Sequence, residues 1–145
     1  MYLLDSDILS ILNLRSGELF ATVFSRFEDV NDEDVFVSIV SFHEQMQGWQ
    51  TYLNRSRTQD GVIRAYGGLE KLLTNFAESQ VLPFDEAAAE VFDELKSKKI
   101  RIGTMDLRIA SIVICNGMVL VTRNTVDFER VPNLSFEDWT TRDPK

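Results

Sequence analysis

The stretch Ile102–Phe128, IGTMDLRIASIVICNGMVLVTRNTVDF, decides how the rest of the chain is interpreted. It contains two apolar runs separated by Gly117, with Asp106 opening the first run and Asp127 following the second. The first run leaves almost no polar face, which predicts a helix that is packed on more than one side. Glycine readily takes the left-handed conformation that ends helices, so a helix should stop at Gly117. Met118–Val121 then predicts a buried strand.

Strands and helices alternate along the rest of the chain. Short apolar or β-branched runs predict strands, and apolar residues at helical spacing predict helices. The predicted strands are Tyr2–Leu4, Val35–Val40, Val81–Phe84 and an edge strand at Leu134–Phe136. The predicted helices cover 8–12, 17–27, 42–53, 62–76 and 85–99. This order predicts an α/β fold, with a mostly parallel sheet of four to five strands and helices on both faces.

Length and composition favour an ordinary globular domain. The 145 residues predict a single domain, 1–145, and the helices around 41–79 predict a hairpin that projects from the sheet. No apolar run reaches the roughly 18 residues that a membrane span requires, and only three apolar residues precede Asp5, so we expect a cytoplasmic protein. The net charge of −8 repels nucleic acid, so any role in binding nucleic acid would need bound cations or local basic patches.

Four carboxylates fall where the carboxyl ends of the predicted strands meet. Asp5 ends the first strand, Glu44 lies one helical turn beyond the second, and Asp106 and Asp127 flank the last helix and strand. Ligands bind at this edge in open α/β sheets. Crowded carboxylates repel one another unless a cation lies among them, and oxygen ligands favour Mg²⁺ or Mn²⁺. Such ions polarise phosphoryl oxygens and activate water, which favours phosphodiester hydrolysis.

Each of these acids also has a structural interpretation. Asp5 could only cap a helix, and Asp106 could only be a first-turn acid that the helix dipole favours. Ser41-x-x-Glu44 fits a capping box, and Asp127 could form an Asx-turn. Taken singly, the structural interpretation is favoured for each acid. It does not explain why all four acids fall on one edge of the predicted sheet.

The basic residues are few but grouped. Lys99 and Arg101 lie just before the central stretch, while Arg108 and Arg123 lie beside its acids. Solvated lysines at a helix end explain the first group, and a rim that contacts substrate phosphates is the alternative. His43, the only histidine, is adjacent to Glu44 and therefore points to another side of the helix, which favours a surface or structural role.

Three segments together resemble a PIN domain, in particular the VapC-type toxin of bacterial toxin–antitoxin pairs. They are LLDSDILSIL, VSIVSFHEQMQGW, and IGTMDLRIASI with GMVLVTRNTVDFERVPNLSFEDW. The resemblance covers essentially the whole chain. It implies a three-layer sandwich and an endoribonuclease that depends on Mg²⁺ or Mn²⁺. It also implies a homodimer that is neutralised by a small antitoxin, whose C-terminal segment enters the active-site groove.

The resemblance also assigns residues. It implies that the metal-binding and catalytic quartet is Asp5, Glu44, Asp106 and Asp127, and that Ser6 and Asn124 are polar supports. The sequence departs from the family at Asp7, where the family usually has Asn. It departs again at His43-Glu44-Gln45, which replaces an Ala-Glu-Leu-like triplet.

Two alternatives remain open at this point. One is a PIN-fold binding module with an impaired site. The other is a PIN nuclease that acts in RNA maturation or on structured DNA.

Overall fold

Residues 1–141 are described in the computed structural model, and a parallel five-stranded sheet forms its centre. The strand order is β3-β2-β1-β4-β5, and every pair of neighbours is parallel. The strands are β1 Tyr2–Leu4, β2 Val35–Ser38, β3 Val81–Leu82, β4 Val119–Val121 and β5 Ser135–Glu137. The prediction of a mostly parallel α/β sheet is confirmed, and the predicted C-terminal edge strand is present as β5.

Within residues 1–141, seven helices connect and cover these strands. They are α1 Ser6–Leu14, α2 Glu18–Arg26, α3 Ile39–Arg55, α4 Gln59–Ala77, α5 Glu86–Ser97, α6 Thr104–Cys115 and α7 Thr125–Phe128. Two short 3₁₀ turns, Phe27–Asp29 and Asp32–Asp34, connect α2 to β2. Within residues 1–141, none of the helices combines the length and the apolar character that crossing a membrane would require.

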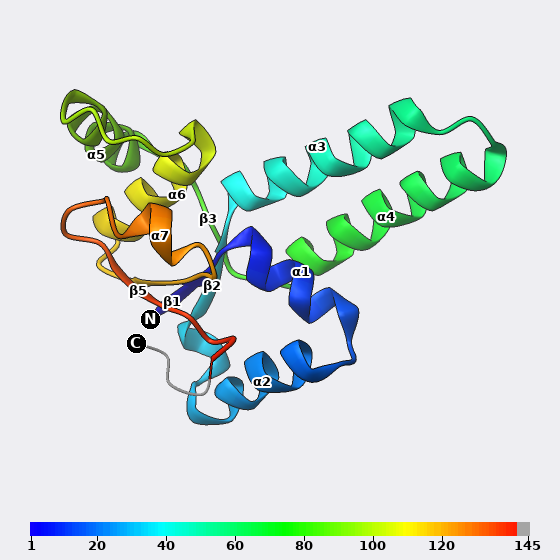
Figure 1. Ribbon diagram of the computed structural model, residues 1–145, viewed down its shortest axis with the longest axis horizontal. Helices are drawn as coiled ribbons and strands as arrows, with labels where there is room; N and C mark the ends of the chain where they lie inside the picture. The colour runs from blue at the N-terminus through cyan, green and yellow to red at the C-terminus, as the bar shows by residue number, and fades with distance from the viewer. Residues whose placement is uncertain (142–145) are drawn as a thin grey trace.

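The strands bury side chains on both faces of the sheet, which produces three layers. Leu3 and Leu120 are fully buried on the face covered by α5 and α6. The next residue of each strand, Leu4 and Val121, is buried on the opposite face against α1 and α2. Successive side chains of a strand point to opposite faces, so both faces of these strands must be apolar. Figure 1 shows α5 and α6 on one side of the sheet and α2 on the other.

The boundary between β2 and α3 lies earlier in the chain than the sequence predicts. The predicted strand ran to Val40, which is wrong, because β2 ends at Ser38 and α3 begins at Ile39. The cause is a helix cap: the Ser38 hydroxyl accepts a hydrogen bond from the Ser41 backbone N–H at 3.1 Å. The predicted stop after α6 is present, since Gly117 has φ +63° directly after this helix.

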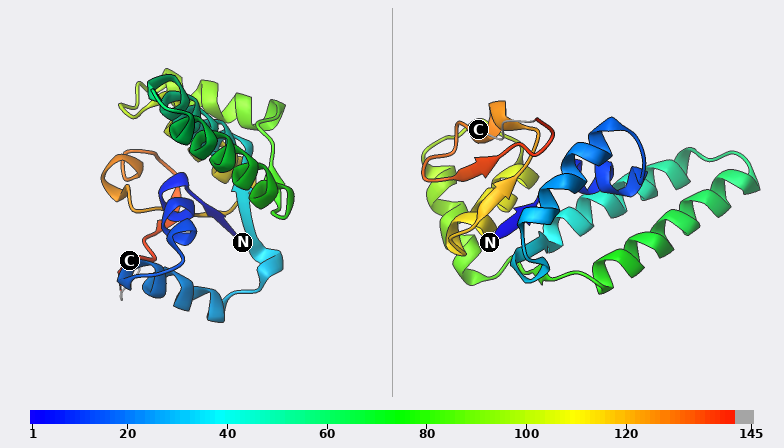
Figure 2. Two further views of the ribbon diagram at one scale, coloured as in Figure 1. Left: turned by 90° about the vertical axis from the view of Figure 1, so that its right-hand side faces the viewer. Right: turned by 90° about the horizontal axis from the view of Figure 1, so that it is seen from below.

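Helices α3 and α4 form an antiparallel hairpin that extends away from the sheet (Figures 1 and 2). Their packing depends on Gly68, because a Cβ atom at this position would lie 2.2 Å from the indole Cε2 of Trp49. Gly67 differs, since a Cβ atom there would meet nothing within 4 Å. The glycine pair inside a helical pattern therefore has one member that is required for close helix contact.

Candidate active site

Asp5 lies at the junction of β1 and α1 and is almost fully buried, with 5% of its surface exposed. Its Oδ1 accepts a hydrogen bond from the Ser6 backbone N–H at 2.8 Å, so it caps α1 as one sequence interpretation predicted. Its Oδ2 accepts a hydrogen bond from the Thr122 hydroxyl at 2.8 Å. Capping explains only one of the two carboxylate oxygens. The other oxygen is directed towards the residue that follows β4.

Thr122 is the main site residue that the sequence analysis missed. It is fully buried directly after β4, and its hydroxyl also accepts a hydrogen bond from the Asn124 backbone N–H at 3.0 Å. The chain thereby ties the carboxyl end of β4 to that of β1. The available signal was a hydroxyl residue placed immediately after a buried strand, at the edge where parallel sheets bind ligands.

Glu44 reaches the same edge from the second turn of α3. The Ser6 hydroxyl donates to Glu44 Oε1 at 2.9 Å, which joins the beginning of α1 to α3. The capping-box interpretation of Ser41-x-x-Glu44 is wrong, because Ser38 rather than Ser41 caps α3. Glu44 is therefore directed towards α1 by a hydrogen bond that spans 38 residues of sequence.

Asn124 connects the remaining two acids. Its side-chain Nδ2 lies 3.1 Å from Asp127 Oδ2 and 3.4 Å from Asp106 Oδ2. Asp106 is in the first turn of α6, and Asp127 is in the short helix α7 after β4. The other oxygen of Asp127 lies 3.6 Å from the Arg130 guanidinium. One amide thus holds two carboxylates that come from different elements.

Asp7 adds a fifth carboxylate to the cluster. Its Oδ2 accepts a hydrogen bond from the Arg123 backbone N–H at 3.0 Å and lies 3.5 Å from the Thr122 hydroxyl. Its Oδ1 is buried and has no hydrogen-bond partner among the described residues. Burial raises the pKa of Asp7, and the backbone N–H of Arg123 opposes this rise. The hydrogen bond from Arg123 to Asp7 therefore links α1 to the connection between β4 and α7.

The acids influence one another electrostatically. Burial raises the pKa of Asp5 to about 7, with further contributions from the neighbouring Asp7 and Asp106 carboxylates. Burial also raises the pKa of Asp106 to about 6, assisted by Glu44, Asp127 and Asp7. All five carboxylates therefore lie in one region, and their charged forms are destabilised in the absence of a cation.

The chemistry of these donors fits a hard divalent cation. The cluster supplies carboxylate oxygens, which Mg²⁺ and Mn²⁺ prefer, and one of them is buried without a partner in the described part of the chain. As the side chains stand in residues 1–141, no group of three or more Asp, Glu, His or Cys side chains could hold a metal ion. Ion binding would therefore require these side chains to move closer together.

The four basic residues predicted to contact substrate do not form a single group. The Arg108 guanidinium lies 5.9 Å from the centre of the Phe92 ring, so it packs against α5. Arg123 is exposed beside Asp7, and its charge lowers the pKa of that acid. Lys99 and Arg101 are exposed in the connection from α5 to α6, where the Arg101 carbonyl accepts from Arg130 at 2.8 Å. Only Arg123 is thus placed directly beside the acids.

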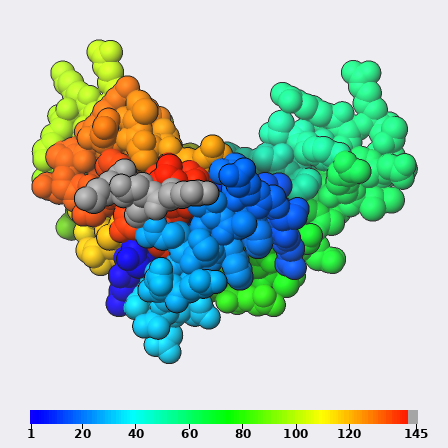
Figure 3. Space-filling model, turned by 60° about the horizontal axis from the view of Figure 1, so that its bottom comes forward, coloured from blue at the N-terminus to red at the C-terminus, as the bar shows by residue number. Residues whose placement is uncertain are grey.

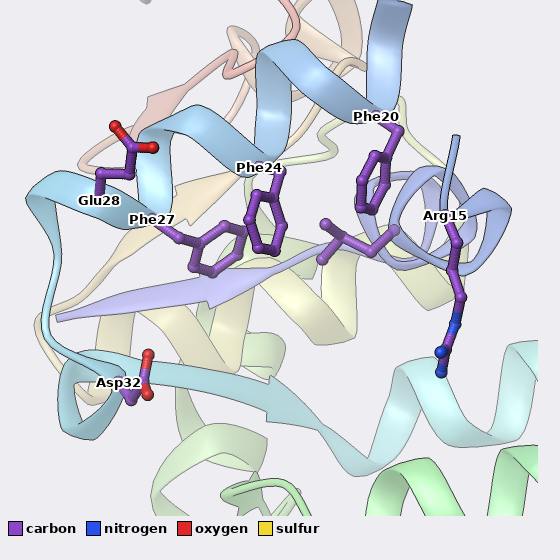
Figure 4. A pocket seen from close by; sticks show the side chains of 7 residues that line it. Arg15, Phe20, Phe24, Phe27, Glu28 and Asp32 are labelled. Carbon is purple, nitrogen blue, oxygen red and sulfur yellow. The ribbon is translucent and has the colours of Figure 1, made fainter. Parts of the chain in front are cut away.

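The surface around the site has two lobes. In Figure 3 the α3–α4 hairpin and the part that contains α5 and α7 are separated by a saddle, with α1 at its base. A separate apolar groove of about 750 Å³ lies on the α1–α2 side, and it is lined in part by Phe20, Phe24 and Phe27 (Figure 4). None of its lining residues belongs to the carboxylate cluster.

The chain is similar to known proteins in sequence and in fold. No protein-family model matches it. Ribonuclease VapC2 from Rickettsia felis is 46% identical over 50 residues, a stretch that covers 34% of this chain and only 37% of that relative. Ribonuclease VapC1 from Haemophilus influenzae is 26% identical over 142 residues, which cover 97% of this chain and 98% of that relative.

A solved structure extends the likeness to the fold. A chain in the structure of VapBC-1 from nontypeable Haemophilus influenzae superposes with a TM-score of 0.73 at 21% identity, covering 97% of this chain and 98% of the other. The resemblance to VapC-type PIN-domain proteins is therefore confirmed, by sequence over almost the whole chain and by the arrangement of its strands and helices.

Proposed function

We propose that the chain is an endoribonuclease that hydrolyses RNA phosphodiester bonds with Mg²⁺ or Mn²⁺, and that it acts as the toxin of a toxin–antitoxin pair. One observation carries this proposal. Carboxylates from α1, α3, α6 and α7 meet at the carboxyl edge of the sheet, where burial and mutual repulsion raise the pKa of Asp5 and Asp106. The names of the two relatives, both ribonucleases, support the same reaction.

The acids divide into two pairs in this proposal. Asp5 and Asp106 would bind the first ion, while Asp127 and Glu44 would complete its shell through water or hold a second ion. When bound, the ion supplies polarisation of the phosphoryl oxygen and an activated water.

The chain's own contribution is orientation of these acids. Thr122 and the Ser6 N–H orient Asp5, and the Asn124 amide sets the distance between Asp106 and Asp127. Partners of this kind raise metal affinity by fixing the ligands in place.

Substitution of Asp106 by Asn tests the proposal. The variant keeps the shape of the side chain but removes a charge that is repelled by its neighbours, so the fold should be retained. Cleavage of total RNA in the presence of Mn²⁺ should fall at least about 100-fold, because loss of a mere partner of a metal ligand already costs about 10- to 100-fold. Growth inhibition on expression should disappear with it. Full activity of Asp106→Asn would contradict the assignment.

Thermal unfolding with Mn²⁺ separates an enzyme from a binding module with an impaired site. A ligand that binds only the native state raises the melting temperature, so the wild-type chain should respond to Mn²⁺ and Asp106→Asn should respond less. If neither protein responds and the wild-type chain cleaves no RNA, the module is favoured. Cleavage of structured DNA in preference to RNA would favour the other nuclease alternative.

The proposed partners are RNA, a small VapB-like antitoxin and a second copy of the chain. The apolar groove on the α1–α2 side supports a protein partner, because 54% of the Phe24 side chain is exposed there. The homodimer rests on the family resemblance, and light scattering should then give twice the mass of one chain.

A further inference from the structure

A second groove begins directly beside the carboxylates, between α1 and α3. The hydrogen bond from Ser6 to Glu44 joins the first turn of α1 to the second turn of α3. Beyond this bond lies a hollow of about 380 Å³, which we name the α1–α3 groove; it is lined by Ser10, Asn13, Gln45, Gly48, Trp49 and Tyr52. The groove therefore leads away from the proposed cleavage site along the hairpin.

The side-chain amide of Gln45, a lining residue of this groove, lacks a hydrogen-bond partner for its nitrogen within residues 1–141. Its Nε2 is buried and has no hydrogen-bond partner among the described residues. Leaving a buried amide unpaired costs about 1–3 kcal/mol, so native structures usually supply a partner. Rotation of the half-buried Gln45 side chain into the groove would let a bound ligand supply that partner. The polar edge of a nucleotide base offers acceptors suited to a glutamine amide.

Two aromatic side chains lie further along the same groove. Trp49 and Tyr52 pack edge to face, with ring centres 5.7 Å apart, and 39% of Tyr52 is exposed. Trp49 is fixed from behind, because its indole rests on Gly68 of α4. A partly exposed ring held by a rigid neighbour is a suitable surface for stacking an unpaired base.

The outer end of the groove is positively charged. A second hollow of about 520 Å³ adjoins it, sharing Gly48 and Tyr52, and Arg55 and Arg57 are among the residues that line it. Within residues 1–141, neither arginine takes part in a salt bridge. On a chain of net charge −8, two unpaired cations next to an aromatic groove favour a polyanionic ligand.

From these observations we infer that the α1–α3 groove holds a single-stranded RNA segment next to the cleaved phosphodiester. Tyr52 stacks on a base, Gln45 contacts a base edge, and Arg55 and Arg57 contact phosphates. Helix geometry places Arg55 roughly 16 Å from Glu44 along α3, which is room for a few nucleotides. This inference rests on the proposed nuclease function and adds the residues that would position and select the substrate.

The experiment measures RNA binding separately from cleavage. The full chain carrying Asp106→Asn serves as the parent, and its dissociation constants are measured by fluorescence anisotropy for four labelled homopolymeric ten-nucleotide RNAs. Into this parent we introduce Tyr52→Ala, Gln45→Leu, or Arg55→Gln together with Arg57→Gln. The matched controls are Tyr66→Ala and Arg64→Gln, since both residues are exposed on α4 and line neither hollow.

The groove variants should weaken binding where the controls do not. Loss of one stacked base should raise the dissociation constant at least about fivefold for Tyr52→Ala. The double arginine variant should bind more weakly to all four RNAs. The slope of log affinity against log salt concentration should become shallower by the amount expected for about one to two lost phosphate contacts. Gln45→Leu should change the ratios among the four RNAs. Tyr66→Ala and Arg64→Gln should leave the dissociation constants within about twofold.

Three outcomes overturn the inference. If the groove variants bind RNA like the parent while the wild-type chain cleaves RNA with Mn²⁺, the α1–α3 groove does not bind RNA. The proposed nuclease function would then be unaffected. A change of oligomeric state in Tyr52→Ala, with unchanged RNA affinity per chain, would make the groove an interface between copies instead. A wild-type chain that neither cleaves nor binds RNA would overturn the proposed function, and the groove with it.

Discussion

Asp5 caps a helix and also belongs to the carboxylate cluster, two roles that the sequence presents as alternatives. One oxygen caps α1 through the Ser6 N–H, and the other accepts from Thr122 in the buried layer beneath the site. The cap orients the carboxylate, and burial raises its pKa. A helix cap and a metal ligand are therefore compatible in one residue. Asp106 shows the same combination, as a first-turn acid whose pKa is raised by burial and by three neighbouring acids.

The raised pKa values of Asp5 and Asp106 predict how stability depends on pH in the absence of metal. Both values, about 7 and about 6, exceed the unfolded value of 3.8, so the folded state holds protons that the unfolded state has released. The free energy of unfolding should therefore fall as pH rises from about 4 to about 7. Melting temperatures measured in EDTA should be higher by a few degrees at about pH 5 than at about pH 7.5.

Asp106→Asn provides the control for this dependence. The variant removes the titrating carboxyl of residue 106 and lowers the repulsion on Asp5, so its melting temperature should change less over the same pH range. Saturating Mn²⁺ should also reduce the dependence in the wild-type chain, because a bound cation favours the charged carboxylates. Identical pH profiles for the two proteins in EDTA would show that these acids do not titrate in this way.

The α3–α4 hairpin contains a very close contact between its helices. Trp49 of α3 occupies the space next to the backbone of Gly68 in α4, while Gly67 faces open space. Two adjacent glycines inside a helix would by themselves be expected to weaken it. The structure shows that one of them allows the two helices to pack, and that this contact supports one wall of the α1–α3 groove.

Two neighbouring substitutions should have opposite effects on stability. Gly68→Ala places a Cβ atom against the Trp49 indole, and overpacking of this kind costs about 1–3 kcal/mol. Gly67→Ala meets nothing within 4 Å and gains helix propensity worth about 0.5–1 kcal/mol. Chemical denaturation should therefore place the midpoint of the first variant below the wild type and that of the second above it. Equal destabilisation by both would exclude Trp49 as the cause.

The whole molecule separates its carboxylate cluster from its most apolar groove. The carboxylates gather at the carboxyl edge of the sheet, whereas Phe20, Phe24 and Phe27 line a groove formed by α1, α2 and the following 3₁₀ turn (Figure 4). The rings of Phe20 and Phe24 stack at 5.3 Å between centres. A partner bound in this groove can therefore hold the chain without using the cleavage chemistry itself.

Phe24→Glu tests this separation in the proposed toxin–antitoxin pair. A charge in the groove should weaken binding of the proposed antitoxin at least about tenfold, since a buried aromatic anchor typically contributes 2 kcal/mol or more. RNA cleavage by the isolated chain should be unchanged. Tyr66→Glu, an equally exposed aromatic on α4, is the control. Calorimetry on co-purified proteins measures the affinity, and unchanged binding by Phe24→Glu would exclude this groove as the antitoxin site.

Local sequence patterns were sufficient to predict the strands, the six longer helices, the parallel sheet and the edge where Asp5, Glu44, Asp106 and Asp127 gather, but they did not predict the four-residue helix α7. The physical reason is that periodicity reports burial, and the carboxyl ends of parallel strands must share an edge. The same patterns misplaced the start of α3, because either Ser38 or Ser41 can cap a helix in this sequence. Local pattern alone does not choose between two equivalent caps.

Only the tertiary structure decided which side chains meet. The Thr122 hydroxyl reaches Asp5 across 117 residues of sequence, and the Ser6 hydroxyl reaches Glu44 across 38. The unpaired Gln45 amide and the aromatic wall beside it depend on how α1 lies against α3. Such contacts depend on how whole helices and strands pack against one another. Sequence periodicity does not determine that packing. Hence the metal-ligand candidates could be predicted from the sequence, whereas their supports and the neighbouring groove could not.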